Sequence, residues 1–380
     1  MRRLIVFVCV TSVTFVGIGA GGCGTGTSGR IGDTEIEAAT EPDDVVRTLR
    51  MVLTPSADDP RTVVQPDRSS ARVAARALAG PAEALSNGEI AVQIMSSGQI
   101  CDKPKMCLAA LQERRIDVYR STVSELGLLI PELHALDIPY LFESDEVVQM
   151  VFSGSFFARM RDAIIDRTGI RLMGISNAGG WRSIASETPV IRTPSDMQEL
   201  TLGTIDSPVE AEWARALGAL PVVIPVSELS DALVDGRVSG ATEGEVALVQ
   251  TNIDGPLLTL TRDRHGYQTA LWLMNDHFFQ TLPNELQRVL QSSFDEMVRV
   301  MWTWSRTREM EAIEEFEAAG GRLLVLSEEE RKEFLMAAGR VSTWHTEMHG
   351  YDWLVWLEGA IAEAERAIAT AKRKSGTSGS

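Results

Sequence analysis

Hydrophobic and polar positions along the chain follow two periods. Segments with a period of two residues alternate with segments whose period is three to four residues. Apolar and polar residues alternate over short stretches such as 89–95, which is typical of a half-buried strand. Between these stretches, apolar residues recur every three or four positions, as on one face of a helix. The pattern predicts strands at 48–54, 89–95, 116–121 and 170–176, and helices at 69–87 (interrupted at Pro81), 107–113 and 145–166. Strands that alternate with helices indicate largely parallel sheets covered by helices.

The longest helical pattern covers residues 285–319. Its apolar positions, among them Leu286 and Phe294, recur every three or four residues. Pro283 precedes the pattern and Gly320 follows it, which are a normal start and stop for a helix. At ~1.5 Å per residue this helix would be about 50 Å long, so we expect it to run along more than one domain.

The N-terminus carries an export signal. Arg2 and Arg3 precede an apolar run at 4–20, which is the architecture of a secretory signal peptide. The sequence Ala-Gly-Gly-Cys that ends at Cys23 resembles the lipobox of bacterial lipoproteins. That resemblance implies cleavage just before Cys23 and lipidation of its thiol. The segment 23–47 is rich in small and acidic residues, which predicts a flexible tether. The alternative is an ordinary cleaved signal with an incidental cysteine.

Length and charge narrow the class of protein. Without the signal, about 358 residues remain, more than one hydrophobic core usually serves, so we expect two domains. The whole chain has a formal net charge of −17. Nucleic acid is excluded as a partner because phosphate binding needs clustered positive charge. No second apolar run approaches membrane-spanning length, so we expect an extracytoplasmic body, in the periplasm or on the outer face of the cell membrane, held by its lipid.

Two cysteines, Cys101 and Cys107, belong to this body. An oxidising exterior permits a disulfide between them, and the loop that contains Pro104 would close it. A shared metal ion is the rival interpretation, but no nearby histidine or further cysteine completes a metal site. We therefore expect the disulfide.

Several short segments, in a fixed order, resemble the substrate-binding proteins of TRAP transporters. The matching segments are DIPYLFES at 137–144, TPSDM at 193–197, LGALP at 217–221 and SELSDALVDG at 227–236. IMSSGQI at 94–100 and TLPNEL at 281–286 match as well. The resemblance spans roughly Leu49 to Ala369, which is nearly the whole chain after the signal.

This resemblance implies an α/β, two-lobed fold like that of periplasmic binding proteins, with parallel or mixed sheets and a long domain-spanning helix. The protein would capture a small polar organic molecule between its lobes and deliver it to a TRAP-type membrane permease. No catalysis and no cofactor are implied, and we expect a monomer. The expected parts are a signal peptide at 1–22, the tether at 23–47, lobe I at 48–179 plus 268–308, lobe II at 180–267 plus 309–370, and a flexible tail at 371–380. A ligand-binding lipoprotein that serves a sensor would have the same sequence pattern.

The resemblance also indicates ligand-binding positions. Arg182 matches one frequent binding arginine of the family, and Trp181 beside it could supply an apolar wall. The usual second arginine is replaced by Gly203, and Glu243 stands where an asparagine often faces the ligand. The pocket thus keeps one cation, loses another and gains an anion. We expect a polar ligand that touches Arg182 and carries at most one acidic group.

Further candidates come from the ends of predicted strands. Arg120, Ser121 and Thr122 end one strand, and Tyr140 lies at a similar edge. The carboxyl ends of strands commonly face ligand clefts in α/β proteins. We therefore expect these side chains near the ligand, with core packing as the alternative for each.

One pair of histidines raises the alternative of a metal-dependent enzyme. His345 and His349 lie four residues apart, so they would share a helix face and could hold zinc. The metalloprotease motif H-E-x-x-H needs a glutamate directly after the first histidine, whereas Glu347 lies two positions on. A solvated helix face is therefore the favoured interpretation, and we expect no enzyme.

Overall fold

The computed structural model describes residues 46–53, 69–95, 100–187, 190–251, 255 and 257–377. The predicted signal peptide, the lipidation site at Cys23 and all but the last two residues of the predicted tether lie outside these ranges. Among the described residues, no helix has both the length and the apolar character needed to cross a membrane.

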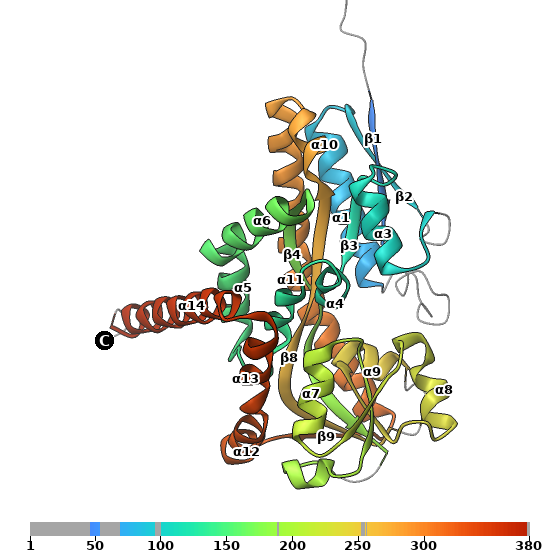
Figure 1. Ribbon diagram of the computed structural model, residues 1–380, viewed down its shortest axis with the longest axis vertical. Coiled ribbons are helices and arrows are strands. Elements are labelled where there is room, and N and C mark those ends of the chain that lie inside the picture. The colour runs from blue at the N-terminus through green and yellow to red at the C-terminus, as the bar shows by residue number, and fades with distance from the viewer. Residues whose placement is uncertain are drawn as a thin grey trace, which may run out of the picture. The chain divides into compact units, whose positions relative to one another are not determined.

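The described residues form one mixed β-sheet of nine strands (Figure 1). The strands follow the order β2-β1-β3-β8-β4-β7-β5-β6, and β9 pairs with β8. Their bounds are β1 Arg47–Val52, β2 Ile90–Met95, β3 Val118–Ser121, β4 Ile170–Ser186, β5 Thr201–Thr204, β6 Leu220–Val223, β7 Gly240–Gly244, β8 Thr259–Asn275 and β9 Arg322–Val325. β1 pairs in parallel with β2 and β3, and β5 with β6 and β7, whereas β4 and β8 are antiparallel to each other. The sheet is therefore mixed, and its parallel groups are joined by antiparallel strands.

The two long strands β4 and β8 run through the middle of the sheet. Each has 17 residues, three times the usual length of a strand. Their pairing shifts at three places, and at the middle shift, between Asn177 and Gly180, Gly180 has a φ of 74° that suits glycine. To one side of this shift β8 pairs with β3, and to the other side β4 pairs with β7. The shift therefore separates two groups of strands that share β4 and β8.

Helices lie against both groups of strands. Their bounds are α1 Ser70–Leu85, α3 Pro104–Gln112, α4 Val123–Gly127, α5 Asp145–Ser153, α6 Ser155–Thr168, α7 Pro208–Ala216, α8 Leu229–Val234, α9 Glu245–Thr251, α10 Asp276–Thr281, α11 Asn284–Ala318, α12 Glu328–Ala338, α13 Arg340–His349 and α14 Asp352–Thr377, with 3-10 helices η3 Pro131–Asp137, η4 Pro194–Met197 and η5 Val226–Glu228. α14 continues to Thr377, so the tail expected at 371–380 is helical up to that residue.

Two predicted helices differ from the expectation. α1 continues past Pro81 to Leu85 rather than being interrupted, because a proline removes one helical hydrogen bond without ending a helix that buries its apolar face. The helix expected at 145–166 is two helices, α5 and α6, which meet at Gly154. A Cβ at Gly154 would lie only 2.9 Å from the Met150 carbonyl oxygen, so the break requires glycine.

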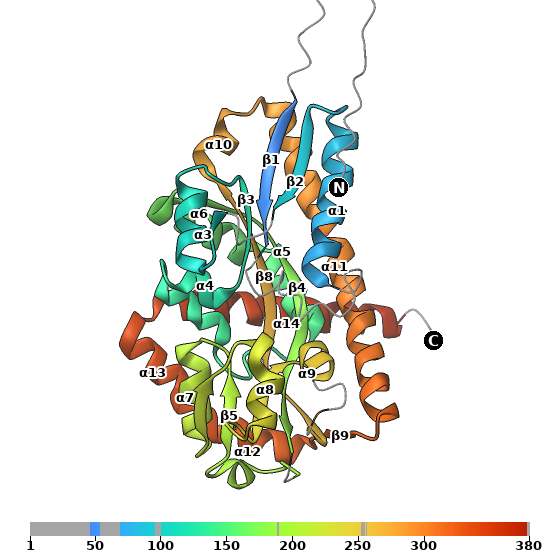
Figure 2. The same cartoon turned by 90° about the vertical axis from the view of Figure 1, so that its right-hand side faces the viewer.

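The long helix predicted at 285–319 is confirmed as α11, which has 35 residues. Its first half buries Leu290 and Phe294 in a cluster with the apolar face of α1, and Figure 2 shows α1 alongside this half. Its last turns bury Ala312 and Phe316 in another cluster, with residues of α8 and α9. One helix thus supplies apolar side chains to two separate parts of the core.

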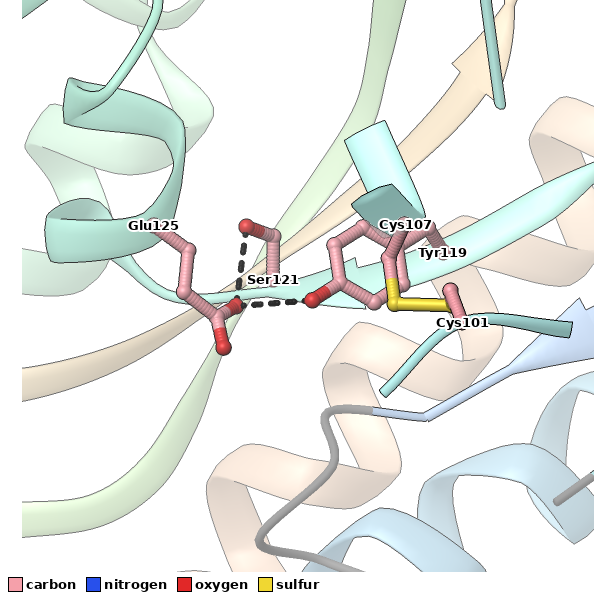
Figure 3. Close-up of a disulfide and its surroundings, with 5 residues drawn as sticks. All are labelled: Cys101, Cys107, Tyr119, Ser121 and Glu125. Carbon is pink, nitrogen blue, oxygen red and sulfur yellow. Dashed lines mark hydrogen bonds between the residues drawn. A yellow bond between two sulfur atoms is a disulfide. The ribbon is translucent and has the colours of Figure 1, made fainter. Parts of the chain in front are cut away.

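Cys101 and Cys107 form the predicted disulfide, with an S–S distance of 2.08 Å. Both cysteines are buried, and they belong to the same apolar cluster as Tyr119 of β3. Figure 3 shows the disulfide beside the Tyr119 ring. The bridge therefore fixes the segment before α3 to that helix, and the cysteines pack with Tyr119 of β3, close to the pocket described below.

Candidate functional site

A pocket of about 530 Å³ lies beside the register shift of β4 and β8. Its wall is built by β3 and α4, by β7, α9 and the segments that follow β5 and β6, and by one face of α11. Its volume falls within the ~300–1,000 Å³ that is usual for small-molecule sites. Its charged lining residues are Arg120, Glu125, Asp137, Arg182, Asp206, Glu243, Arg308 and Glu315.

Arg182 lies on β4, opposite Gly244 of β7 and Gly266 of β8. A Cβ at Gly266 would lie 3.3 Å from Arg182 Cδ, so glycine leaves room for the side chain. Arg182 is 6% exposed, and its guanidinium contacts Glu210 (Nη1–Oε2 3.2 Å) and Asp137 (Nη2–Oδ1 3.9 Å). Burial lowers the pKa of Arg182, but the carboxylates of Glu210 and Asp137 outweigh this and raise it. Arg182 is therefore a fixed cation whose two Nη groups face protein carboxylates.

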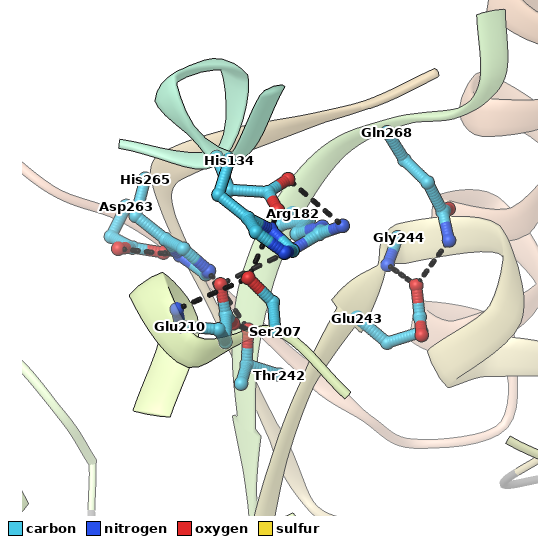
Figure 4. Close-up of polar contacts among 11 residues, drawn as sticks. His134, Arg182, Ser207, Glu210, Thr242, Glu243, Gly244, Asp263, His265 and Gln268 are labelled. Carbon is cyan, nitrogen blue, oxygen red and sulfur yellow. Dashed lines mark hydrogen bonds and ion pairs between the residues drawn. The ribbon is translucent and has the colours of Figure 1, made fainter. Parts of the chain in front are cut away.

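A buried network of charges lies behind this guanidinium (Figure 4). Glu210 Oε1 accepts a hydrogen bond from Thr242 Oγ1 at 2.7 Å and lies 3.3 Å from His265 Nε2. His265 Nδ1 lies 3.0 Å from both carboxylate oxygens of Asp263. The His265 ring also stacks on Trp213, with the ring centroids 4.1 Å apart. The histidine is thus held between two carboxylates and an indole ring.

Both Glu210 and His265 are charged at neutral pH. Burial lowers the pKa of His265, but Asp263 and Glu210 raise it to about 9. Burial raises the pKa of Glu210, but His265 and Arg182 lower it to about 2. The carboxylate of Glu210 therefore contacts protein groups on both oxygens, and one of these contacts holds Arg182 in place.

Asp137 is the second acid beside Arg182, and it comes from η3. It accepts a hydrogen bond from Ser207 Oγ at 2.9 Å and lies 3.2 Å from His134 Nδ1. Ser207 is also the N-cap residue of α7, whose first turn carries Glu210. The start of α7 therefore positions both carboxylates that contact Arg182. Arg182 Nε is buried and has no hydrogen-bond partner among the described residues.

Glu243, on β7, is 6% exposed and lines the pocket. Its Oε1 accepts hydrogen bonds from the Gly244 backbone N–H, at 2.9 Å, and from the Gln268 side-chain amide (Figure 4). Burial raises the pKa of Glu243, and the charge of Arg182 offsets part of that rise. Oε1 is thus saturated by protein donors, whereas Oε2 has no partner among the described residues.

Glu125 is another acidic residue that lines the pocket. Its Oε2 accepts hydrogen bonds from the Thr122 backbone N–H at 3.0 Å, from Ser121 Oγ at 3.2 Å and from Tyr119 Oη at 3.2 Å. Figure 3 shows the Tyr119 ring between the disulfide and this carboxylate. Burial raises the pKa of Glu125, and these bonds and the charge of Arg120 offset part of the rise. The disulfide region thus positions a second acid on the wall.

α11 contributes an arginine to the pocket. Arg308 is 4% exposed, and its Nη1 contacts the carboxylates of Glu311 and Glu315, the latter at 3.6 Å. Its Nε and Nη2 are buried and have no hydrogen-bond partner among the described residues. Nε and Nη2 form the edge of a guanidinium that can bind a carboxylate with two parallel hydrogen bonds. Arg308, which lines the pocket, therefore holds donors that are buried and unused.

The pocket brings together four of the positions that the sequence indicated. Arg120, Thr122, Arg182 and Glu243 all line it. They come from β3, the cap of α4, β4 and β7. These strands are distant in sequence and meet only because β4 and β8 carry both groups of strands.

The other four positions lie in the interior instead of on this wall. Ser121 is fully buried and bonds to Glu125. Trp181 is 2% exposed and packs edge-on against the Tyr267 ring, with the centroids 4.9 Å apart. Tyr140 donates a hydrogen bond to Asp263 at 2.8 Å. A Cβ at Gly203 would contact Leu229 Cδ1 at 3.4 Å, so this position packs beneath α8.

Sequence reasoning missed Gln268, Glu125 and Arg308. Arg308 had a usable signal, because it falls on the buried stripe of α11, seven residues after Met301 and four before Ala312. A charged residue at an apolar position of a helix is rarely buried without a partner. Gln268 had no such signal, since its role depends on glycines in other strands.

The two histidines considered as zinc ligands lie on α13. His345 is buried on α13, and its ring lies 5.0 Å from that of His349. Burial lowers the pKa of His345 to about 4, and the neighbouring His349 and His134 act in the same direction. No group of three or more His, Cys, Asp or Glu in the described part of the chain could hold a metal ion. His345 is a neutral core side chain.

The chain matches the family described as bacterial extracellular solute-binding protein, family 7, over residues 62–345. The match covers every strand from β2 to β9 and the whole of α11. It therefore includes all of the residues that line the pocket.

Individual relatives are distant. A solute-binding protein of Sulfitobacter is 26% identical over 214 residues, which are 55% of this chain and 63% of that protein. The chain thus aligns with less than two thirds of the length of that relative. The C4-dicarboxylate-binding periplasmic protein DctP of Rhodobacter capsulatus is 26% identical over 235 residues, 62% of this chain and 69% of that protein.

The fold is shared with solved structures. A TRAP periplasmic solute-binding protein of Marinobacter aquaeolei, solved in an open state without ligand, superposes with a TM-score of 0.73. It is 22% identical, and the match covers 83% of this chain and 100% of that chain. The α/β fold of periplasmic binding proteins, with a mixed sheet and a long helix, is therefore confirmed.

Proposed function

This chain belongs to family 7 of the bacterial extracellular solute-binding proteins, and from that premise we propose that it captures a small polar organic solute in the pocket and delivers it to a TRAP-type membrane permease. The family binds solutes and does not catalyse reactions. The observation that carries the proposal is a pocket of about 530 Å³ whose wall holds three buried arginines. Buried cations that face a cavity are suited to hold an organic anion.

The unused donors on the wall support a solute with a carboxylate group. Arg308 has two buried nitrogen donors without an acceptor, and Arg182 has one, among the residues that the structure describes. A buried donor that lacks a partner costs ~1–3 kcal/mol, and a ligand carboxylate that accepts from it recovers this cost. The Rhodobacter capsulatus relative is named for binding C4-dicarboxylates, which also carry carboxylate groups.

The arrangement of strands supports the two lobes and a closing motion between them. The proposed boundaries, lobe I at 48–179 plus 268–308 and lobe II at 180–267 plus 309–370, cross β4 and β8 next to the register shift at Asn177 and Gly180. The pocket takes residues from both sides of these boundaries. A solute that touches both sides would stabilise the closed state, as in hinge-bending binding proteins.

The lipid anchor is also part of the proposal. The lipobox-like sequence that ends at Cys23 supports attachment to the membrane. The described body supplies no membrane-spanning helix of its own. Tethering at the membrane surface would keep the loaded receptor, as a monomer, close to its permease and raise its effective concentration there.

The proposal is tested by thermal unfolding in the presence of C4-dicarboxylates, sugar acids, short monocarboxylates and amino acids. A bound solute at 100 times its Kd stabilises the folded state by about 2.7 kcal/mol, which is a readily measured rise in melting temperature. A protein whose melting temperature does not respond to any of these acids would contradict the proposal.

Two variants on α11 then localise the binding. Arg308→Met removes the unused donors. We expect it to lower the affinity for the bound acid by roughly 10- to 100-fold, because a charged hydrogen bond is lost. Arg306→Met is the matched control, because Arg306 is exposed on the same helix. Calorimetry that finds equal affinities in the two variants would place the solute elsewhere.

A further inference from the structure

The pocket wall presents a carboxylate oxygen that no described protein group uses. Oε2 of Glu243 has no hydrogen-bond partner among the described residues. It is not among the buried side-chain atoms that lack a partner, so it is accessible from the pocket side. Since Glu243 lines the pocket, this oxygen borders the space that a solute would occupy. Arg182, a cation of the same wall, directs its Nη groups to Glu210 and Asp137 instead.

The surrounding residues hold Glu243 in this orientation. The Gln268 amide and the Gly244 N–H both donate to Oε1. The Gln268 side chain in turn fits between two glycines: a Cβ would lie 2.1 Å from its Oε1 at Gly179 and 2.3 Å from it at Gly244. Residues of three strands, β4, β7 and β8, are therefore arranged to fix one oxygen of Glu243 and leave the other for the pocket.

The charges on the wall favour a cationic group in the solute. Five acidic side chains and three arginines line the pocket. Each arginine already has a carboxylate nearby: Glu210 and Asp137 for Arg182, Glu311 for Arg308, and Glu125 for Arg120. A solute with two carboxylates would bring one of them toward the acids of this wall.

We propose that the solute carries a protonated amino group that donates a hydrogen bond to Oε2 of Glu243, so that the protein binds a zwitterionic, amino-acid-like acid and not a dicarboxylate without an amino group. This inference rests on the proposed function, since it concerns the solute of the same pocket. Glu243 is then the residue that determines specificity, and Gln268 is a positioning residue. The arginine donors remain for the carboxylate of the same solute.

Burial supports this assignment. It raises the pKa of Glu243, because the ionised carboxylate loses its hydration. Arg182 offsets only part of that rise, and an ammonium group within hydrogen-bond distance supplies the hydrogen-bonded cation that Oε2 lacks. A hydroxyl group at the same place would supply a hydrogen bond without that charge.

The test uses pairs of probes that differ only in an amino or a hydroxyl group: aspartate with malate, glutamate with 2-hydroxyglutarate, and alanine with lactate. Melting temperatures and calorimetry at neutral pH report binding. We expect the amino member of at least one pair to bind, at least tenfold more tightly than its hydroxyl partner. Glu243→Gln keeps the shape of the side chain and should lower the affinity for that amino probe roughly 10- to 100-fold. Glu363→Gln, an exposed acid on α14, should change nothing.

The outcomes separate this inference from the proposed function. Hydroxy acids that bind as tightly as amino acids, with affinity kept in Glu243→Gln, would overturn the inference and leave the solute-binding role intact. The inference also fails, and the role again stands, if simple organic acids stabilise the protein and no amino acid does. If neither class stabilises it, both proposals fail. The melting temperature of each variant without solute shows that it is folded.

Discussion

His265 is the residue at which burial and charge compete most strongly. It is almost fully buried, yet its pKa is raised to about 9 because Asp263 and Glu210 lie on either side of its ring. A raised pKa means that the folded state binds the proton more tightly than the unfolded state does. The charged histidine therefore stabilises the fold, and through Glu210 it helps to hold Arg182.

The pH dependence of stability follows from this pKa. The contribution of His265 is fully present below its ordinary pKa of ~6.5 and is lost as pH rises through about 9. Glu210 acts in the opposite sense: its pKa is lowered to about 2, so its contribution is present above ~4.5 and is lost as pH falls through about 2. The two contributions are complete together between about pH 4.5 and 6.5.

We expect the free energy of unfolding to fall by on the order of 3 kcal/mol between about pH 6.5 and 9.5 because His265 loses its proton. Urea denaturation across that range measures it. His265→Gln should remove most of this slope and should also be less stable at about pH 6, since Asp263 and Glu210 lose the charge between them. His277→Gln, at an exposed position of α10, is the control and should keep the slope of the parent protein. Equal slopes in all three proteins would refute the assignment.

For single residues, the sequence predicted the chemical types that line the pocket better than it predicted which positions face the pocket. Arg182 and Glu243, which were predicted to bind the ligand, line the pocket. Trp181 and Ser121, each next to a pocket residue in sequence, face the interior because successive side chains of a strand point to opposite faces. Tyr140 was placed at a strand edge, but its hydrogen bond to Asp263 depends on β8, which lies 123 residues further along the chain. Such partners are set by strand pairing, which one sequence does not show.

At the scale of elements, periodic patterns were the most informative signal. α11 was predicted to within a residue at each end, since its apolar stripe is long and Pro283 and Gly320 flank it. The break between α5 and α6 was missed because a glycine within a helical pattern does not by itself reveal an extended backbone. The length of β4 was underestimated, because a buried strand of 17 residues has no regular alternation to mark its end.

The disulfide between Cys101 and Cys107 lies close to the pocket. It closes a short loop at the start of α3, and such a loop contributes about 2 kcal/mol through the entropy of the unfolded chain. We expect Cys101→Ser/Cys107→Ser to lower the free energy of unfolding by about that amount. Because Tyr119 packs with the cysteines and bonds to Glu125, solute affinity should fall as well.

Chemical denaturation of the parent protein with and without reductant provides the comparison for that variant. The reduced parent should match the double serine variant. Mass spectrometry of the native protein without reductant supplies an independent check. Two free thiols there, or a stability that reductant does not change, would contradict the bridge.

For the whole molecule, the position of the pocket follows from the two strands that pass through the sheet. β3 pairs with β8 on one side of the register shift at Asn177 and Gly180, and β7 pairs with β4 on the other side. α11 lines the same pocket and also packs into two parts of the core. The segment order and the long helix indicated this architecture from the sequence, whereas the site needed the pairing of strands that are distant in the chain.

We expect a lipid on Cys23 to hold the molecule at the membrane. The sequence before Cys23 resembles a lipobox, and a thiol is the atom that a lipoprotein offers for lipid attachment. Each buried CH₂ of an acyl chain contributes ~0.8 kcal/mol to membrane binding, whereas a serine offers no thiol. We therefore expect Cys23→Ser either to release the protein from membranes or to block its processing. Cys9→Ser, within the apolar run of the signal, is the matched control and should fractionate like the parent. Membrane fractionation and the mass of the mature protein measure both outcomes, and a Cys23→Ser variant that stays in the membrane fraction with the parent mass would rule out the anchor.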